Sequence, residues 1–142
     1  MSRISLLLVD DHKLIRDGLK SILNSSHNLE IIDECNNGEE CLYFLEFNSH
    51  KIDVILMDIH MPKVNGIEAT EIIKKLYPNI KVLALTMHTE EAYIMSMIKA
   101  GALGYVLKDS SRETLIEGIK VVFNDENYYS KEVSVKLINI LL

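Results

Sequence analysis

The chain has 142 residues, 48% of them hydrophobic and 25% charged, which is the composition of one globular domain with a full core. With 15 Lys and Arg against 21 Asp and Glu, its formal net charge is -6, which argues against nucleic acid or an anionic membrane as a partner of this segment. The longest early apolar stretch, 6–9, is too short for a signal peptide or a membrane span, so we expect a cytoplasmic protein.

Short apolar segments alternate with longer amphipathic segments along the chain. The segments with strand character are 4–9, 29–35, 54–57, 81–85 and 104–107. The segments with helical spacing are 12–23, 39–48, 67–76, 90–100 and 112–124. Thr89 is the expected cap of the fourth helix, and Ser110 or Ser111 that of the fifth. In the first helix, we expect the core-facing residues to be Leu14, Ile15, Leu19, Ile22 and Leu23.

Regular alternation of five strands with five helices predicts an α/β fold, with a doubly wound five-stranded parallel sheet and helices on both of its faces. A polar break at 124–127 follows the last of these helices. Residues 128–142 then have the apolar spacing of a short amphipathic helix, so we expect a linker from 125 to 142.

Polar side chains follow four of the predicted strands: Asp10 and Asp11, then Asp58, Thr86 and Lys108. The carboxyl ends of parallel strands meet at one edge of a sheet, so we expect these side chains to lie together. Three carboxylates repel one another unless a cation offsets their charge, and oxygen ligands favour Mg²⁺. A lysine and a hydroxyl suit the oxygens of a phosphoryl group. The pattern predicts that Asp58 attacks a phosphoryl donor, with Mg²⁺ held by Asp11 and Asp58.

Each of these residues also has an ordinary structural role. Asp10 or Asp11 alone would suit a helix N-cap, Asp58 could close a loop, Thr86 could be a loop hydroxyl, and Lys108 a solvated surface charge. Their joint placement at successive strand ends favours the functional interpretation.

Four motifs resemble the receiver domain of two-component response regulators, over roughly residues 3 to 124: Asp10-Asp11, Met57 to Pro62 with Gly66, Leu85-Thr86, and Gly104 to Lys108. The resemblance implies a receiver domain at 1–124 with a flavodoxin-like fold and strand order 2-1-3-4-5. It implies that Asp58 is the phosphoacceptor, that Asp10 belongs to the acidic pocket, and that the backbone carbonyl of His60 is a further Mg²⁺ ligand. It also implies that Thr86 and Tyr105 form a switch pair, with Tyr105 moving inward on phosphorylation.

Further motifs are similar to the LuxR-type (NarL/FixJ) subfamily: Asp10-Asp11-His12, Gly18-Leu19, Thr86-Met87-His88, Ala100-Gly101-Ala102, Gly104 to Asp109, and Tyr128-Tyr129-Ser130. This resemblance implies a sensor histidine kinase as phosphoryl donor and transcription control through a C-terminal helix-turn-helix domain. Because the sequence stops on Ile140-Leu141-Leu142, we expect that DNA-binding domain to be missing here. Asp109 departs from the wider family, in which a proline commonly follows the lysine.

Two further expectations concern regulation. The helices at 12–23 and 112–124 carry apolar stripes broader than a core face needs, which predicts a homodimer. The resemblance implies that Met87, His88 and His60 line the approach of water to the phosphoryl group. We expect the long Met87 side chain to slow its loss more than either imidazole speeds it.

Other functions receive less support from the sequence. A Mg²⁺-dependent phosphatase needs an acid two residues after the nucleophile, where His60 stands, so we expect no enzyme beyond self-phosphorylation and its reversal. A flavodoxin-like FMN carrier lacks its phosphate loop, and Asp10-Asp11 would repel the phosphate. A protein-interaction domain working unphosphorylated is not favoured by an intact pocket. A zinc site has too few ligands, since only His60 and His88 are expected near the pocket.

Overall fold

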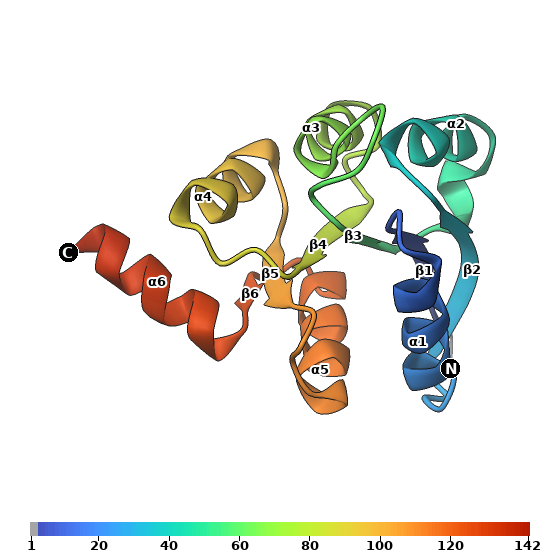
Figure 1. Cartoon of the computed structure of the whole chain (residues 1–142). Helices are drawn as coiled ribbons and strands as arrows, with labels where there is room; N and C mark the ends of the chain where they lie inside the picture. Colours follow the sequence, from blue (N-terminus) through green and yellow to red (C-terminus); the bar gives the residue numbers. More distant parts are fainter. Residues whose placement is uncertain (1–2) are drawn as a thin grey trace.

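The computed structural model describes residues 3–142 as a six-stranded parallel sheet between two layers of helices (Figure 1). The strands are β1 (Ile4–Val9), β2 (Leu29–Cys35), β3 (Val54–Met57), β4 (Lys81–Thr86), β5 (Gly104–Leu107) and β6 (Tyr128–Tyr129). The helices are α1 (Lys13–Leu23), α2 (Gly38–Asn48), α3 (Gly66–Leu76), α4 (Glu91–Ala100), α5 (Arg112–Phe123) and α6 (Lys131–Leu141), with a 3-10 turn η1 (Ser49–Lys51).

The strand order is β2-β1-β3-β4-β5-β6, which confirms the doubly wound parallel sheet and the predicted order of its first five strands. The prediction of five strands was wrong, because β6 pairs with β5 through Gly104–Tyr128 and Tyr105–Tyr129. The carbonyl oxygen of Tyr128 lies 2.5 Å from where a β-carbon of Gly104 would be, so this approach requires the glycine. The last helix consequently begins at Lys131, not at Tyr128.

The sheet separates two apolar layers. Helices α1 and α5 cover one face, while α2, α3, α4 and α6 cover the other (Figure 1). All four residues of β3 and all four of β5 are buried, as expected for strands that are covered on both faces. Val133 of α6 is fully buried in the apolar layer that lies under α2, α3 and α4, and Leu137 packs against the same layer. The final helix is therefore packed onto the domain.

Helix α1 faces the core differently from the prediction. Leu14 is 83% exposed, and Ile15 and Ile22 also face solvent, whereas Leu23 is buried. Arg16 is buried although it is not among the residues predicted to face the core, and Glu34 of β2 supplies a partner for its charge. In α5, the apolar residues predicted to form a broad outer stripe are mostly in the core: Leu115, Ile116, Ile119 and Val122.

Two predicted helix caps have different outcomes. Ser111 caps α5 as predicted, since its side chain accepts a hydrogen bond from the amide of Thr114. Thr89 does not cap α4, because that helix begins at Glu91 with Glu90 as its N-cap. Within residues 3–142, no helix is both long enough and apolar enough to cross a bilayer.

Candidate functional site

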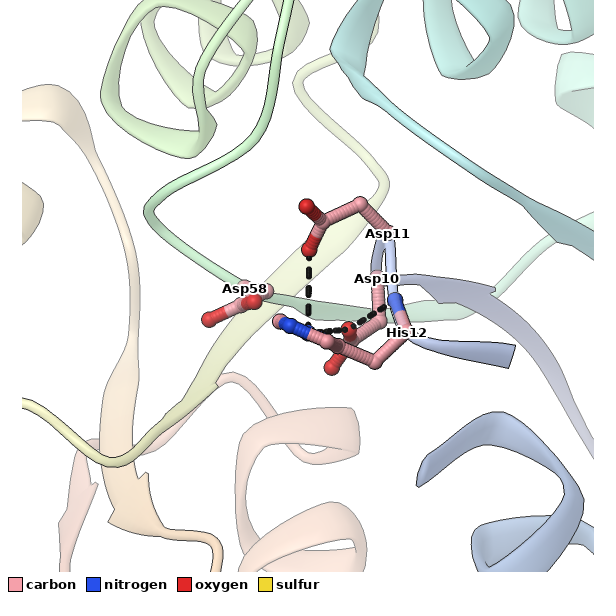
Figure 2. Close-up of side chains that lie close together, drawn as sticks. All are labelled: Asp10, Asp11, His12 and Asp58. Atoms are coloured by element: carbon pink, nitrogen blue, oxygen red, sulfur yellow. Dashed lines mark hydrogen bonds and ion pairs between the residues drawn. The ribbon is translucent and has the colours of Figure 1, made fainter. Parts of the chain in front are cut away.

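Three carboxylates meet at the carboxyl edge of the sheet. Asp10 and Asp11 follow β1, and Asp58 follows the neighbouring β3. One ligand atom from each of these residues, together with one from His12, lies within 4.8 Å of the others (Figure 2). Asp10 and Asp58 are buried, whereas Asp11 and His12 are exposed. The predicted meeting of the strand ends is therefore confirmed, and one side of the pocket is open to water.

Lys108, which directly follows β5, is the cation of this pocket. Its Nζ atom lies 2.5 Å from Oδ2 of Asp10 and 3.2 Å from Oδ2 of Asp58. Burial raises the pKa of Asp58 above its ordinary value, against the lowering effect of Lys108, and the charge of Asp10 raises it further. One ammonium among three carboxylates leaves excess negative charge, which a bound cation would offset.

The loop after β3 fixes the Asp58 backbone closely. The Asp58 amide donates to the carbonyl of Val9 at 3.0 Å, and Oδ1 of Asp58 accepts from the amide of Ile59 at 2.9 Å. At the start of α3, a β-carbon on Gly66 would lie 1.9 Å from the Asp58 carbonyl oxygen. The loop therefore requires glycine there, because the two backbones touch. Asn65 caps α3 through a capping box with Glu68, which fixes the far end of the loop.

His12 is a pocket residue that the sequence reasoning missed. Its Nδ1 atom lies 3.2 Å from Oδ1 of Asp10 and 3.1 Å from Oδ1 of Asp11 (Figure 2). The expectation that only His60 and His88 approach the pocket was therefore wrong. Only the position of His12 in the sequence could have indicated this contact. It directly follows Asp10 and Asp11 at the turn into α1, from which its ring reaches both carboxylates.

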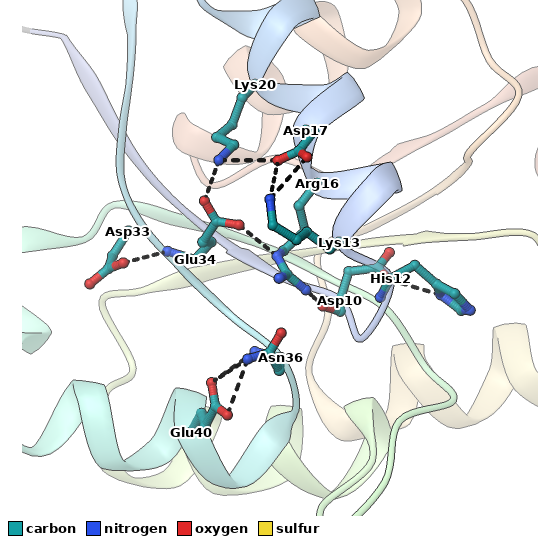
Figure 3. A network of polar contacts seen from close by, with 10 residues as sticks. All are labelled: Asp10, His12, Lys13, Arg16, Asp17, Lys20, Asp33, Glu34, Asn36 and Glu40. Atoms are coloured by element: carbon teal, nitrogen blue, oxygen red, sulfur yellow. Dashed lines mark hydrogen bonds and ion pairs between the residues drawn. The ribbon is translucent and has the colours of Figure 1, made fainter.

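An ion-pair network around the buried Arg16 side chain lies next to the pocket (Figure 3). Nε of Arg16 lies 2.7 Å from a Glu34 carboxylate oxygen, and Nη1 of Arg16 donates to the backbone carbonyl of Asp10. Lys20 also binds Glu34, at 2.5 Å. The hydrogen bonds from Lys20 and Arg16 lower the pKa of Glu34. Arg16 therefore links α1 and β2 to the backbone of Asp10, the first acidic residue of the pocket.

Thr86 and Tyr105 both hold the backbone of His88. The His88 amide donates to the Thr86 hydroxyl at 3.2 Å, and the Tyr105 hydroxyl donates to the His88 carbonyl at 2.7 Å. Tyr105 and Thr86 are both fully buried. The Tyr105 ring is therefore already inside the domain in this conformation, and it is linked to the loop that carries His88.

The three residues expected to tune phosphate loss lie near this loop. The rings of His60 and His88 contact each other edge to face, with centroids 4.2 Å apart, and the ring of Tyr93 in α4 contacts both, with centroid distances of 4.8 and 5.1 Å. Met87 is 60% exposed. The contact of Tyr93 with both imidazoles was not predicted, because the helical spacing of 90–100 does not indicate which loop the helix packs against.

The pocket has the chemistry of a hard-cation site. Its donors are three carboxylates with one imidazole, and carboxylate oxygens are preferred ligands of Mg²⁺. In residues 3–142 this is the one group of three or more potential ligands that converge, and neither Cys35 nor Cys41 belongs to it. Burial raises the pKa of Cys35 to about 12, as befits a structural thiol. The Lys108–Asp109 peptide is trans, like every other peptide bond of the described residues.

Residues 6–120 match the family described as the response regulator receiver domain. The chain is 41% identical over 137 residues to the transcriptional regulatory protein DegU of Brevibacillus brevis, covering 96% of this chain and 57% of that protein. It is 33% identical over 131 residues to the response regulator UvrY of Escherichia coli K12, covering 92% and 59%. The chain thus spans a little under three fifths of these curated relatives. A LuxR-family two-component response regulator from Aurantimonas sp. SI85-9A1 superposes with a TM-score of 0.90 at 26% identity, covering 97% of both chains.

Proposed function

Because the chain belongs to the receiver-domain family of two-component response regulators, among its LuxR-type members, we propose that it accepts a phosphoryl group from a sensor histidine kinase on Asp58. We further propose that the phosphorylated form controls transcription through a helix-turn-helix output domain. The observation that carries the proposal is Asp58 itself, a buried carboxylate at a strand end, contacted by Lys108 and beside two further carboxylates.

The transfer is a simple exchange of bonds. A carboxylate oxygen of Asp58 forms a bond to phosphorus, while the bond from phosphorus to the donor nitrogen breaks and its electron pair leaves with that nitrogen. Lys108 already lies between Asp10 and Asp58, so its ammonium is in place to bind an oxygen of the incoming group. Thr86 supplies a buried hydroxyl from the neighbouring strand.

The oxygen-rich donor set fits Mg²⁺, with Asp11, Asp58 and the backbone carbonyl of His60 as the proposed ligands and Asp10 as their neighbour. Bound there, Mg²⁺ would neutralise negative charge on the phosphoryl group. The exposed side chains of Asp11 and His12 leave this part of the pocket open for entry.

Intact mass tests the proposal. The 142-residue protein, incubated with MgCl₂ and acetyl phosphate, should gain one phosphoryl group, and excess chelator should prevent the gain. No gain with Mg²⁺ present, under conditions in which the protein is folded, would contradict phosphoryl acceptance.

The proposed switch is the loop around His88. A phosphoryl dianion on Asp58 would attract the Thr86 hydroxyl, which now accepts the His88 amide hydrogen bond. Since Tyr105 holds the carbonyl of the same residue, loss of one of these bonds changes how the loop is anchored to β4 and β5. We propose that this α4–β5 face, with its His88 loop, carries the signal to the output domain.

The exposed Met87 side chain leads to a kinetic prediction. Met87→Ala should speed loss of the phosphoryl group several-fold, because a small side chain leaves water a path to phosphorus. His88→Ala should change the rate little, since the bonds to Thr86 and Tyr105 use the His88 backbone and survive the substitution. Decay of the phosphorylated mass over time measures both rates. An unchanged rate in Met87→Ala, together with a several-fold slower one in His88→Ala, would show that base catalysis dominates.

We also predict that the chain associates with a second copy of itself through α1. Leu14, Ile15 and Ile22 form an exposed apolar strip on α1, and Phe123 of the adjacent α5 is also exposed. Leu14→Ser should weaken a phosphorylation-strengthened homodimer about thirtyfold, because burial of a leucine side chain stabilises by roughly 2 kcal/mol. Leu76→Ser, on α3, is the matched control. Sedimentation that shows a strict monomer at high concentration, with and without acetyl phosphate, would exclude the dimer.

A further inference from the structure

The edge of the sheet formed by β2 and α2 carries a one-sided charge. Between Lys20 and Lys51 the sequence contains no Lys or Arg, but it contains six carboxylates: Glu30, Asp33, Glu34, Glu39, Glu40 and Glu46. In the structure all of these belong to β2 or to α2, which follow one another directly at one end of the strand order. The net charge of the whole chain is -6, so this one edge holds a concentrated share of its acidity.

Most of this charge has no cation inside the domain. Glu34 is the exception, because Arg16 and Lys20 bind it (Figure 3). Within residues 3–142, the other five carboxylates make a single ion pair, Glu39 with Lys63 at 3.7 Å, between two side chains that are more than 60% exposed. An exposed pair of this length contributes little. The remaining acidic side chains face solvent and are available to an external cation.

Two large aromatic side chains stand beside these carboxylates. Tyr43 is 68% exposed and Phe47 66%, and they contact each other edge to face, with ring centroids 5.8 Å apart. A groove of about 500 Å³ runs between α2 and the end of β2, and its lining includes Asp33, Glu39, Glu40 and Tyr43. Exposed aromatic rings next to uncompensated carboxylates combine an apolar contact with a cation-binding one.

We propose that this surface, defined as the solvent-facing side of α2 with the groove beside β2, is a docking site for a basic segment of another protein that carries Arg or Lys next to apolar side chains. A guanidinium can pair with Glu39 or Glu40 while its flat face packs on Tyr43. A neighbouring apolar side chain then covers Phe47. The site is separate from Asp58 and does not depend on phosphoryl acceptance.

The charge of the surface decides among possible occupants. Nucleic acid and anionic membranes would be repelled by the carboxylates. If a second copy of the chain bound through this same surface, carboxylates would face carboxylates and repel one another. A positively charged, partly apolar polypeptide is the partner that gains from both the acidic and the aromatic side chains.

A synthetic peptide of alternating Arg and Leu, labelled with fluorescein, is the probe, and a Glu-Leu peptide of equal length is its control. Fluorescence anisotropy gives the affinity, and amide chemical shifts of the ¹⁵N-labelled protein locate the contact. The Arg-Leu peptide should bind and shift amides of residues 33–47, with affinity falling as salt is raised. The Glu-Leu peptide should not bind.

Two variants and one control separate this site from general acidity. Tyr43→Ser with Phe47→Ser, and separately Glu39→Gln with Glu40→Gln, should each weaken binding about tenfold, since each removes one of the two kinds of contact. Glu71→Gln with Leu76→Ser makes a like change on the exposed side of α3 and should leave the affinity within about twofold. Absence of binding, an equal loss in the α3 control, or shifts centred on Asp10 and Asp11 would each overturn the proposal. So would a dimer that forms through α2 and excludes the peptide.

Discussion

The Asp58→Asn variant should take up no phosphoryl group from acetyl phosphate and Mg²⁺, yet it should fold at least as stably as the wild type. The amide cannot attack phosphorus as a carboxylate does, so chemistry is lost completely. Stability is retained because the pKa of Asp58 is raised, chiefly by burial. An acid whose pKa is higher in the folded state makes folding less favourable once it ionises. Removing that charge also relieves repulsion from Asp10, while Lys108 keeps Asp10 as its partner.

The measurements are intact mass after incubation and urea unfolding of both proteins at neutral and acidic pH. Any stability gain in Asp58→Asn should disappear at a pH low enough to protonate Asp58 in both states. Asp125→Asn is the matched control, because Asp125 lies far along the chain in the turn before β6 and binds only Lys81. A normal phosphoryl gain in Asp58→Asn would remove Asp58 from its proposed role.

Arg16→Met should lower the free energy of unfolding by about 2–4 kcal/mol, the cost of breaking a mostly buried charge pair. The Arg16 side chain is 7% exposed, and its loss takes a donor from Glu34 and from the carbonyl of Asp10. The pKa of Glu34 is lowered by its hydrogen bonds with Lys20 and Arg16. The stability that Glu34 contributes is therefore present above its unfolded-state pKa and is lost as the pH falls through its folded-state pKa.

Urea unfolding as a function of pH tests this prediction. The advantage of the wild type over Arg16→Met should be largest near neutral pH and should shrink in acid. Lys13→Met is the control, since Lys13 makes only an exposed pair with Asp17 and should change stability by less than about 0.5 kcal/mol. A loss below about 1 kcal/mol in Arg16→Met would show that the network is not a support of the pocket.

The parts that the sequence predicts well are those with strong periodic or positional signals. The apolar run 54–57 ending at Asp58 favours a strand buried on both faces, as the structure confirms, and the other strand ends follow from the same pattern. The same pattern predicts that Asp10, Asp11, Asp58 and Lys108 share one edge of the sheet, and the structure brings them together there.

The parts that it misses depend on contacts between distant residues. Two tyrosines are too short a segment to show strand periodicity, so β6 is defined by its pairing with Gly104 and Tyr105 and not by its own sequence. Arg16 is buried because Glu34, 18 residues away, faces it across α1 and β2. The site of His12 depends on how tightly the chain turns after β1. For β6 and Arg16 the deciding contact is made with a residue far along the chain, whereas for His12 it depends on the conformation of a local turn.

The position of the phosphoryl group is the most direct test of the central claim. Borohydride reduces an aspartyl phosphate to homoserine, so reduction of the protein after incubation with acetyl phosphate and Mg²⁺, followed by peptide mass analysis, locates the acceptor. We expect homoserine at position 58 and unchanged aspartate at positions 10 and 11. Homoserine at another aspartate, or a phosphoryl gain that leaves no homoserine at all, would contradict the account.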